Sequence, residues 1–122
     1  KRRGIALAAA VADGWALPTV LGLGNPTDLG YFSKKRDQIL AALESVGRDP
    51  ATFDISAQVS TGTTAAERRW ALDQAREAVE RGATHVILGM PPGLGRAGVD
   101  AVAREVAEPF RDAIAEGPRT AA

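Results

Sequence analysis

Apolar and polar residues follow two different periods along this chain, and the segments with each period alternate. Residues 53–59 switch strictly between apolar and polar positions, which predicts a strand with one buried face and one polar face. Residues 85–90 are almost all apolar, which predicts a strand buried on both faces. Residues 15–17 precede Pro18 and predict a third, very short strand.

Helical segments are predicted between these strands. Residues 3–12 are rich in alanine, and Ser33 is the predicted N-cap of the next helix. Thr64 and Glu67 form the pattern of a capping box, and Pro109 is expected to kink or divide the last helix. The predicted helices cover residues 3–12, 33–46, 64–81 and 98–115. Their predicted inward-facing residues are Ile39, Leu40, Leu43, Val46, Leu72, Ala75, Ala78, Val79, Val99, Val102, Val106, Phe110 and Ile114.

The connections between these elements also carry signals. Residues 18–32 contain several glycines and prolines and predict a long loop. Gly47 and Gly82 follow two predicted helices and suit the left-handed position after a helix end. Strict alternation of helices and strands predicts an α/β fold with parallel strands joined by helical crossovers. Three strands leave two open sheet edges, and a closed (β/α)8 barrel typically has about 250 residues.

Composition excludes several kinds of site. The 122 residues include 15 basic and 15 acidic side chains, so no net charge favours nucleic acid or a membrane surface. The absence of cysteine excludes disulfides and thiolate chemistry, and a single histidine argues against a zinc site. No apolar run is long enough to span a bilayer, and we expect a cytoplasmic protein.

Two segments are candidates for phosphate binding. Residues 93–98 match GxGxxG after a strand, but Pro91 and Pro92 occupy the place of the tight turn that a dinucleotide site needs. A flexible loop is therefore the favoured interpretation, with a phosphate contact as the alternative. Residues 1–4 (KRRG) place three cations at a helix N-terminus, where they oppose the helix dipole unless an anion binds there. A solvated chain segment is the alternative interpretation.

Polar residues of the predicted strands are a further set of candidates. Asp54, Ser56 and Gln58 share one face of their strand, which would face the lumen of a barrel or the solvent around an open sheet. His85 lies at a strand start, the end of a barrel away from its active site, so a structural or surface role is favoured over catalysis. Trp70 is assigned to packing. No set of residues in the sequence identifies the catalytic groups.

Two stretches resemble a known family. Residues 5–15 (IALAAAVADGW) resemble the segment usually written L-R-L-A-A-R-x-A-D-G-W-N in luciferase-like monooxygenases. Residues 44–50 (ESVGRDP) are similar to that family's E-x-x-G-R-D-P, and residues 82–86 (GATHV) and a last helix with a late proline also agree. The similarity covers nearly the whole chain. Ala16 stands where the family has asparagine.

The resemblance implies a fold and an activity. The chain would be the C-terminal part of one (β/α)8 TIM-type barrel domain, with the last three strands and four helices present as a partial barrel. The protein would be an oxidoreductase that uses a deazaflavin (F-420) or FMN on a small organic substrate. Arg2, Arg3 and Gly4 would then lie beside the cofactor phosphate. The candidates for the substrate pocket are Trp15, for which packing is the favoured interpretation, Gln58 and Met90.

The same resemblance names the partners of this segment. The first five strands would carry most of the cofactor pocket and the usual catalytic groups, so the missing N-terminal part of the barrel is the expected partner. Two other interpretations stay open. One is a non-catalytic α/β module that closes its sheet by forming a homo-oligomer. The other is a small nucleotide-binding domain that uses the glycine-rich run of residues 93–98.

Overall fold

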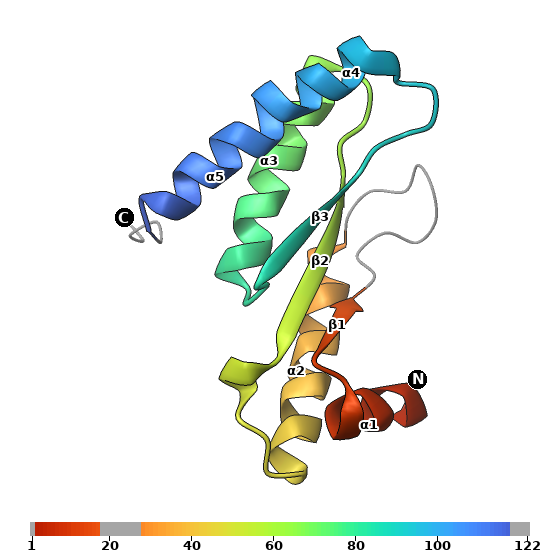
Figure 1. Cartoon of the computed structure of the whole chain (residues 1–122), viewed down its shortest axis with the longest axis vertical. Helices are drawn as coiled ribbons and strands as arrows, with labels where there is room; N and C mark the ends of the chain where they lie inside the picture. The colour runs from red at the N-terminus through yellow and green to blue at the C-terminus, as the bar shows by residue number, and fades with distance from the viewer. Residues whose placement is uncertain (1, 18–27, 118–122) are drawn as a thin grey trace.

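The computed structural model describes residues 2–17 and 28–117, which form a mixed α/β structure around a three-stranded parallel sheet (Figure 1). Part of the predicted loop, residues 18–27, lies outside the described residues. The elements are α1 (Arg2–Val11), β1 (Gly14–Leu17), α2 (Leu29–Ser45), the 3-10 turn η1 (Pro50–Thr52), β2 (Asp54–Ser60), α3 (Ala65–Glu80), β3 (His85–Gly89), α4 (Gly95–Val102), the π-helical segment η2 (Ala103–Ala107) and α5 (Glu108–Ala115).

The strands lie side by side in the order β1-β2-β3, which is also their order in the chain. Both pairings are parallel, with Trp15 opposite Ile55 and Ser56 opposite His85. Each crossover therefore leads to the neighbouring strand, as the alternation of helices and strands predicts.

The core lies on one side of this sheet. Ile55 and Ala57 of β2 join a buried cluster with residues of α1 and α2, and Val59 packs in a second cluster with Val102 and Val106. The predicted alternation along β2 is confirmed, because its apolar side chains are buried and its polar ones are exposed or half-buried. The cluster members by element are Ile5 and Ala9 (α1), Leu29, Phe32, Ile39 and Leu43 (α2), and Ala71 and Ala78 (α3).

The prediction that the third strand is buried on both faces is wrong. Along β3, His85 and Ile87 are exposed while Val86 and Leu88 are half-buried, and the side chain of Ile87 keeps 45% of its surface accessible. The apolar character of this strand did not reveal which face the helices leave uncovered, because burial depends on the elements packed against it.

Helix α2 begins earlier than predicted. Asp28 is its N-cap and accepts a hydrogen bond from the backbone N–H of Tyr31 at 2.9 Å, so Ser33 lies inside the helix. The Ser33 hydroxyl instead accepts a hydrogen bond from Nη1 of Arg81 at 2.8 Å. Val46, which was expected to face inward, is 50% exposed just after the helix end.

The predicted signals at both ends of α3 and at the end of α2 are confirmed. Thr64 caps α3, and the carboxylate of Glu67 accepts a hydrogen bond from the Thr64 backbone N–H, which completes the capping box. Gly47 and Gly82 have φ angles of 73° and 104°, the left-handed conformation expected after α2 and α3. These local patterns act within one helical turn, so they can be read directly from the sequence.

Pro109 divides the last helix, as predicted. Proline has no N–H to donate to the carbonyl of residue 105, and the helix widens into the π-helical segment η2 just before it. At the C-terminal end of η2, the N–H of Glu108 donates to the carbonyl of Ala103, five residues earlier. Val102 and Val106 are buried as expected, whereas Val99 and Ile114 are exposed, contrary to prediction.

Candidate functional site

The face of the sheet away from the core is the main candidate for a binding surface, and we call it the uncovered face. The strand register and the alternation of side chains assign to it Ala16, Asp54, Ser56, Gln58, Ser60, His85, Ile87 and Gly89. Asp54, Gln58 and His85 are exposed, and Ser56 and Ser60 are half-buried. Among the described residues, polar side chains therefore outnumber apolar ones on this face.

Gln58 occupies the carboxyl-terminal half of β2 on the uncovered face. Its side chain leans towards β3, because a Cβ atom built on Gly89 would lie 3.6 Å from Nε2 of Gln58. Ile87 is its neighbour in register, and Met90 follows directly after β3 with 44% of its surface exposed. Within the described part of the chain, the carboxamide of Gln58 has no hydrogen-bond partner. The structure thus places Gln58 beside Ile87 on the uncovered face, whereas the strand register, which ends at Gly89, does not assign Met90 to that face.

Trp15 lies on the opposite face. It pairs in register with the buried Ile55 and packs, half-buried, against the core cluster. Its ring also lies beside α1, since a Cβ atom on Gly4 would be 3.6 Å from its Cη2 atom. This position gives Trp15 a packing role and separates it from Gln58.

Arg2 and Arg3 open α1 and are exposed. Because α1 packs against α2 and beside Trp15, these two guanidinium groups lie on the β1 side of the sheet, with β2 between them and β3. Lys1 lies outside the described residues. The structure therefore does not bring Arg2 and Arg3 into contact with Met90.

The Asp-Gly-Trp stretch has a structural explanation. The carbonyl of Asp13 accepts a hydrogen bond from the N–H of Asp54 at 2.9 Å, which sets the start of the β1–β2 pairing. Gly14 is the first residue of β1, and a Cβ atom there would lie 2.7 Å from the backbone oxygen of Asp54. Glycine is needed because the neighbouring strand approaches so closely, whereas the sequence suggested only a helix-ending turn.

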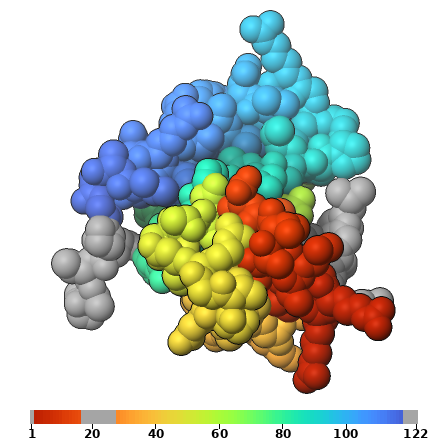
Figure 2. Space-filling model, turned by 60° about the horizontal axis from the view of Figure 1, so that its bottom comes forward, coloured from red at the N-terminus to blue at the C-terminus, as the bar shows by residue number. Residues whose placement is uncertain are grey.

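The Gly-Arg-Asp-Pro stretch joins α2 to β2 and holds α1 in place. Arg48 donates hydrogen bonds from Nη1 to the carbonyls of Ala9 and Ala12 at 2.9 and 2.7 Å, and its guanidinium lies over the ring of Phe53. Figure 2 shows α1 in red lying against the yellow segment that contains Arg48. Asp49 caps the turn η1 by accepting from the N–H of Ala51. Arg48 and Asp49 therefore stabilise the fold by holding α1 and η1 in place.

The glycine-rich run after β3 differs from a dinucleotide-binding turn. Residues 90–94 separate the strand from α4, and Gly95 already belongs to the helix. Gly98 lies one helical turn on, where a Cβ atom would come within 2.4 Å of the Leu94 side chain. Packing of Leu94 therefore explains one of the three glycines, and the predicted loop ends at residue 94 and not at residue 98.

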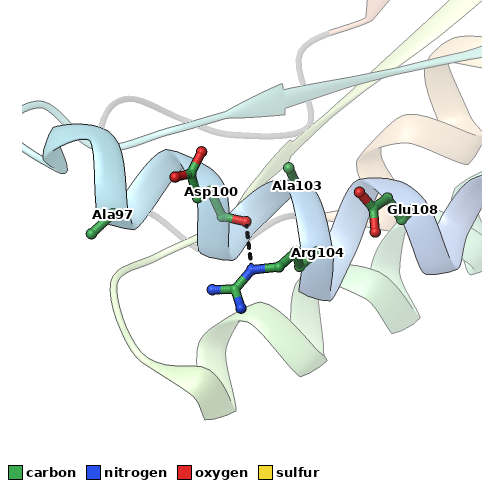
Figure 3. Close-up of a pocket in the computed structure, with 5 residues that line it drawn as sticks. All are labelled: Ala97, Asp100, Ala103, Arg104 and Glu108. Atoms are coloured by element: carbon green, nitrogen blue, oxygen red, sulfur yellow. Dashed lines mark hydrogen bonds between the residues drawn. The ribbon is translucent and has the colours of Figure 1, made fainter.

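A shallow groove follows the last helix (Figure 3). It is lined by Ala97, Asp100, Ala103, Arg104 and Glu108. Nε of Arg104 donates to the carbonyl of Asp100 at 3.4 Å, one turn earlier. Charges of both signs alternate along the groove, so it favours no ligand of a particular charge.

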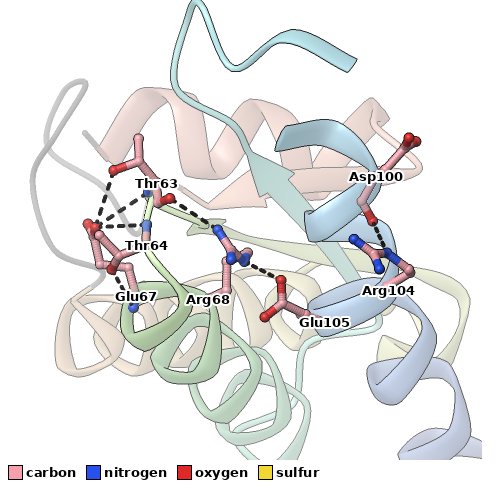
Figure 4. A network of polar contacts seen from close by, with 7 residues as sticks. All are labelled: Thr63, Thr64, Glu67, Arg68, Asp100, Arg104 and Glu105. Atoms are coloured by element: carbon pink, nitrogen blue, oxygen red, sulfur yellow. Dashed lines mark hydrogen bonds and ion pairs between the residues drawn. The ribbon is translucent and has the colours of Figure 1, made fainter. Parts of the chain in front are cut away.

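A network of polar contacts fixes the connection between β2 and α3 (Figure 4). The buried Thr61 donates its N–H to the carbonyl of Gly89 at 3.0 Å, which ties the end of β2 to the end of β3. Arg68 donates to the carbonyl of Thr63 and forms a 2.7 Å ion pair with Glu105 of η2. No pattern in the sequence points to this ion pair, because its members are 37 positions apart.

Hydrogen bonds in the same network change the acidity of Glu67. The pKa of its carboxyl group is lowered, first by the Thr64 side chain and then by the backbone N–H of Thr63. Oε1 of Glu67 accepts from the N–H groups of Thr64 and Thr63 at 3.2 and 3.4 Å. Because donors at the start of α3 favour the charged form, Glu67 acts as a capping anion of the helix.

His85 is placed at the amino ends of the strands. Its Nδ1 lies 3.1 Å from the hydroxyl oxygen of Thr84 and 3.7 Å from a carboxylate oxygen of Asp54. The Thr84 hydroxyl is itself used in the sheet, since it accepts from the N–H of Ile55 at 2.8 Å. His85 is exposed at this end of the sheet. Trp70 lies on α3 with 40% of its surface exposed.

Across residues 2–17 and 28–117, no group of acidic, histidine or cysteine side chains is arranged to hold a metal ion. No helix in those two ranges combines the length and the apolar character that crossing a membrane requires. No family model, curated protein or solved structure matches the chain.

Proposed function

We propose that this chain is the C-terminal part of a (β/α)8 barrel in an oxidoreductase that uses a deazaflavin or FMN on a small organic substrate. The observation that carries the proposal is the sheet itself. Its strands follow chain order, its buried side chains all lie on the helix side, and its uncovered face is polar.

A barrel explains this combination of features. In a barrel the crossover helices form an outer ring, and the inner strand faces turn towards one another. A doubly wound sheet instead has helices on both faces and a reversal of strand order. An uncovered face with Asp54, Gln58 and His85, between two free sheet edges, fits the first arrangement.

The residues present fit one part of a flavin-type cofactor. Exposed Ile87 offers apolar surface next to the carboxamide of Gln58, the mixture typical of ligand sites. Arg2 and Arg3, at the N-terminus of α1, offer guanidinium groups and free N–H groups to a phosphate. Ala16, on the uncovered face, supplies no polar contact where the similar family has asparagine. The bound cofactor would supply the hydride or oxygen chemistry.

Cofactor titration of the full-length protein tests this proposal. We expect its reading frame to add about 150–200 residues ahead of Lys1, with a glycine-rich run just before it. The full-length protein should bind FMN or coenzyme F-420, measured by absorbance and fluorescence. The 122-residue chain alone should not bind either one tightly, because a pocket without its first five strands is not preorganised. Nanomolar binding by the chain alone would contradict this expectation.

The free sheet edges favour a second candidate, a non-catalytic module that closes its sheet with another copy. In the described residues, β1 and β3 each pair with β2 alone, so each has one edge of unpaired backbone groups. Light scattering on the purified chain separates the two proposals. A stable oligomer without cofactor affinity in the full-length protein supports self-assembly, whereas a cofactor-binding barrel supports the oxidoreductase.

A further inference from the structure

We propose that the carboxamide of Gln58 recognises the imide edge of the flavin or deazaflavin ring, and that this residue determines specificity for that edge. The inference rests on the proposed function and names the contact that this chain makes with the cofactor. Three features of Gln58 support it: its position, the chemistry of its side chain and the surface around it.

Gln58 lies where ligands of parallel α/β proteins bind. It is the fifth residue of the seven-residue β2, on the uncovered face and towards the carboxyl end. Its Nε2 lies beside Gly89, the last residue of β3. Active sites of (β/α)8 barrels form at the carboxyl ends of their strands, so this side chain points to the functional end of the proposed barrel.

The carboxamide is free to bind a ligand. It is exposed, and the hydrogen bonds among the described residues do not use it. A glutamine side chain presents one acceptor and one donor next to each other, in one plane. An imide edge presents a carbonyl next to an N–H and is therefore its complement, whereas a phosphate or carboxylate would use only the donor.

The surroundings of Gln58 suit a flat, partly apolar ring. Gly89 has no side chain, and it lies beside the Gln58 amide, since a Cβ atom there would stand 3.6 Å from Nε2, an ordinary contact distance. Ile87, the neighbour of Gln58 in register on β3, is an apolar side chain with 45% of its surface exposed. A planar heterocycle can cover this side chain while its polar edge pairs with the carboxamide.

The test compares FMN with N3-methyl-FMN, in which the imide N–H is replaced, in the full-length protein. Variants are Gln58→Met, which keeps the length of the side chain, Gln58→Glu, which keeps the acceptor, and Gln38→Met as control. Gln38 is an exposed glutamine on α2. Dissociation constants come from fluorescence titration, and circular dichroism checks folding. If the protein binds only coenzyme F-420, the variants are compared by their affinity for that cofactor.

We expect the unmodified protein and Gln38→Met to bind FMN about tenfold more tightly than N3-methyl-FMN, the loss typical of one unmade hydrogen bond between buried partners. Gln58→Met should bind FMN and N3-methyl-FMN equally. Gln58→Glu should weaken FMN binding at least as much as Gln58→Met does. With F-420, Gln58→Met should weaken binding about tenfold.

Two negative results have different meanings. If the unmodified protein binds neither FMN nor F-420, the proposed function fails and this inference fails with it. If it binds cofactor but Gln58→Met keeps the preference for FMN over N3-methyl-FMN, or keeps full affinity for F-420, only the role of Gln58 is refuted. A Gln58→Met variant that does not fold leaves the decision to Gln58→Glu.

Discussion

Replacing Arg48 by methionine should destabilise the chain by about 2–3 kcal/mol. The guanidinium donates from one nitrogen to the carbonyls of Ala9 and Ala12, 2.9 and 2.7 Å away, at the C-terminus of α1. A hydrogen bond with a charged partner contributes about 1.5–3 kcal/mol, but two bonds from one half-buried nitrogen share this energy. Stacking on Phe53, with 5.6 Å between the guanidinium carbon and the ring centre, adds about 0.5–1 kcal/mol. Methionine keeps part of the aliphatic packing.

Urea unfolding followed by circular dichroism measures this loss, with Arg69→Met as the matched control. Arg69 is exposed on α3 and, within the described residues, forms neither a hydrogen bond nor an ion pair. Arg48→Lys should fall between the two, because lysine keeps the charge without the fork of donors. A midpoint for Arg48→Met within error of Arg69→Met would refute the claim that Arg48 anchors α1 to the rest of the fold.

Three other changes give distinct outcomes. Gly14→Ala should cost about 1–3 kcal/mol in the same urea assay, because its Cβ would meet the backbone of Asp54 at 2.7 Å; an unchanged midpoint would show that the strands can separate at no cost. Glu67→Gln should lower the stability at pH 7 but not in strong acid. The folded pKa of Glu67 is lowered, so its contribution is present above the unfolded pKa and disappears as the pH falls through the folded one; a loss that is constant between pH 7 and pH 2 would argue against this. Arg68→Met should cost about 0.5–1 kcal/mol through its pair with Glu105, and the double variant Arg68→Met/Glu105→Gln should cost less than the sum of the single variants.

The candidate site illustrates which parts of a function can be predicted from sequence. Gln58 was named because strict alternation along residues 53–59 put it on the polar face, and that face is indeed the uncovered one. Trp15 was named as a pocket candidate with packing favoured, and only its register with Ile55 assigns it to the helix-covered face. A strand of three or four residues has no alternation long enough to indicate its faces.

The sequence by itself determined the elements whose signals lie within a few residues: the alternation of β2, the capping box of Thr64 and Glu67, and the left-handed Gly82 after α3. Only the tertiary structure decided that Gly14 must lack a side chain and that Arg48 caps a helix more than 30 positions earlier. The reason is physical: a cap or an alternation depends on neighbours in the chain, whereas steric limits, burial and distant hydrogen bonds depend on which segments the fold brings together.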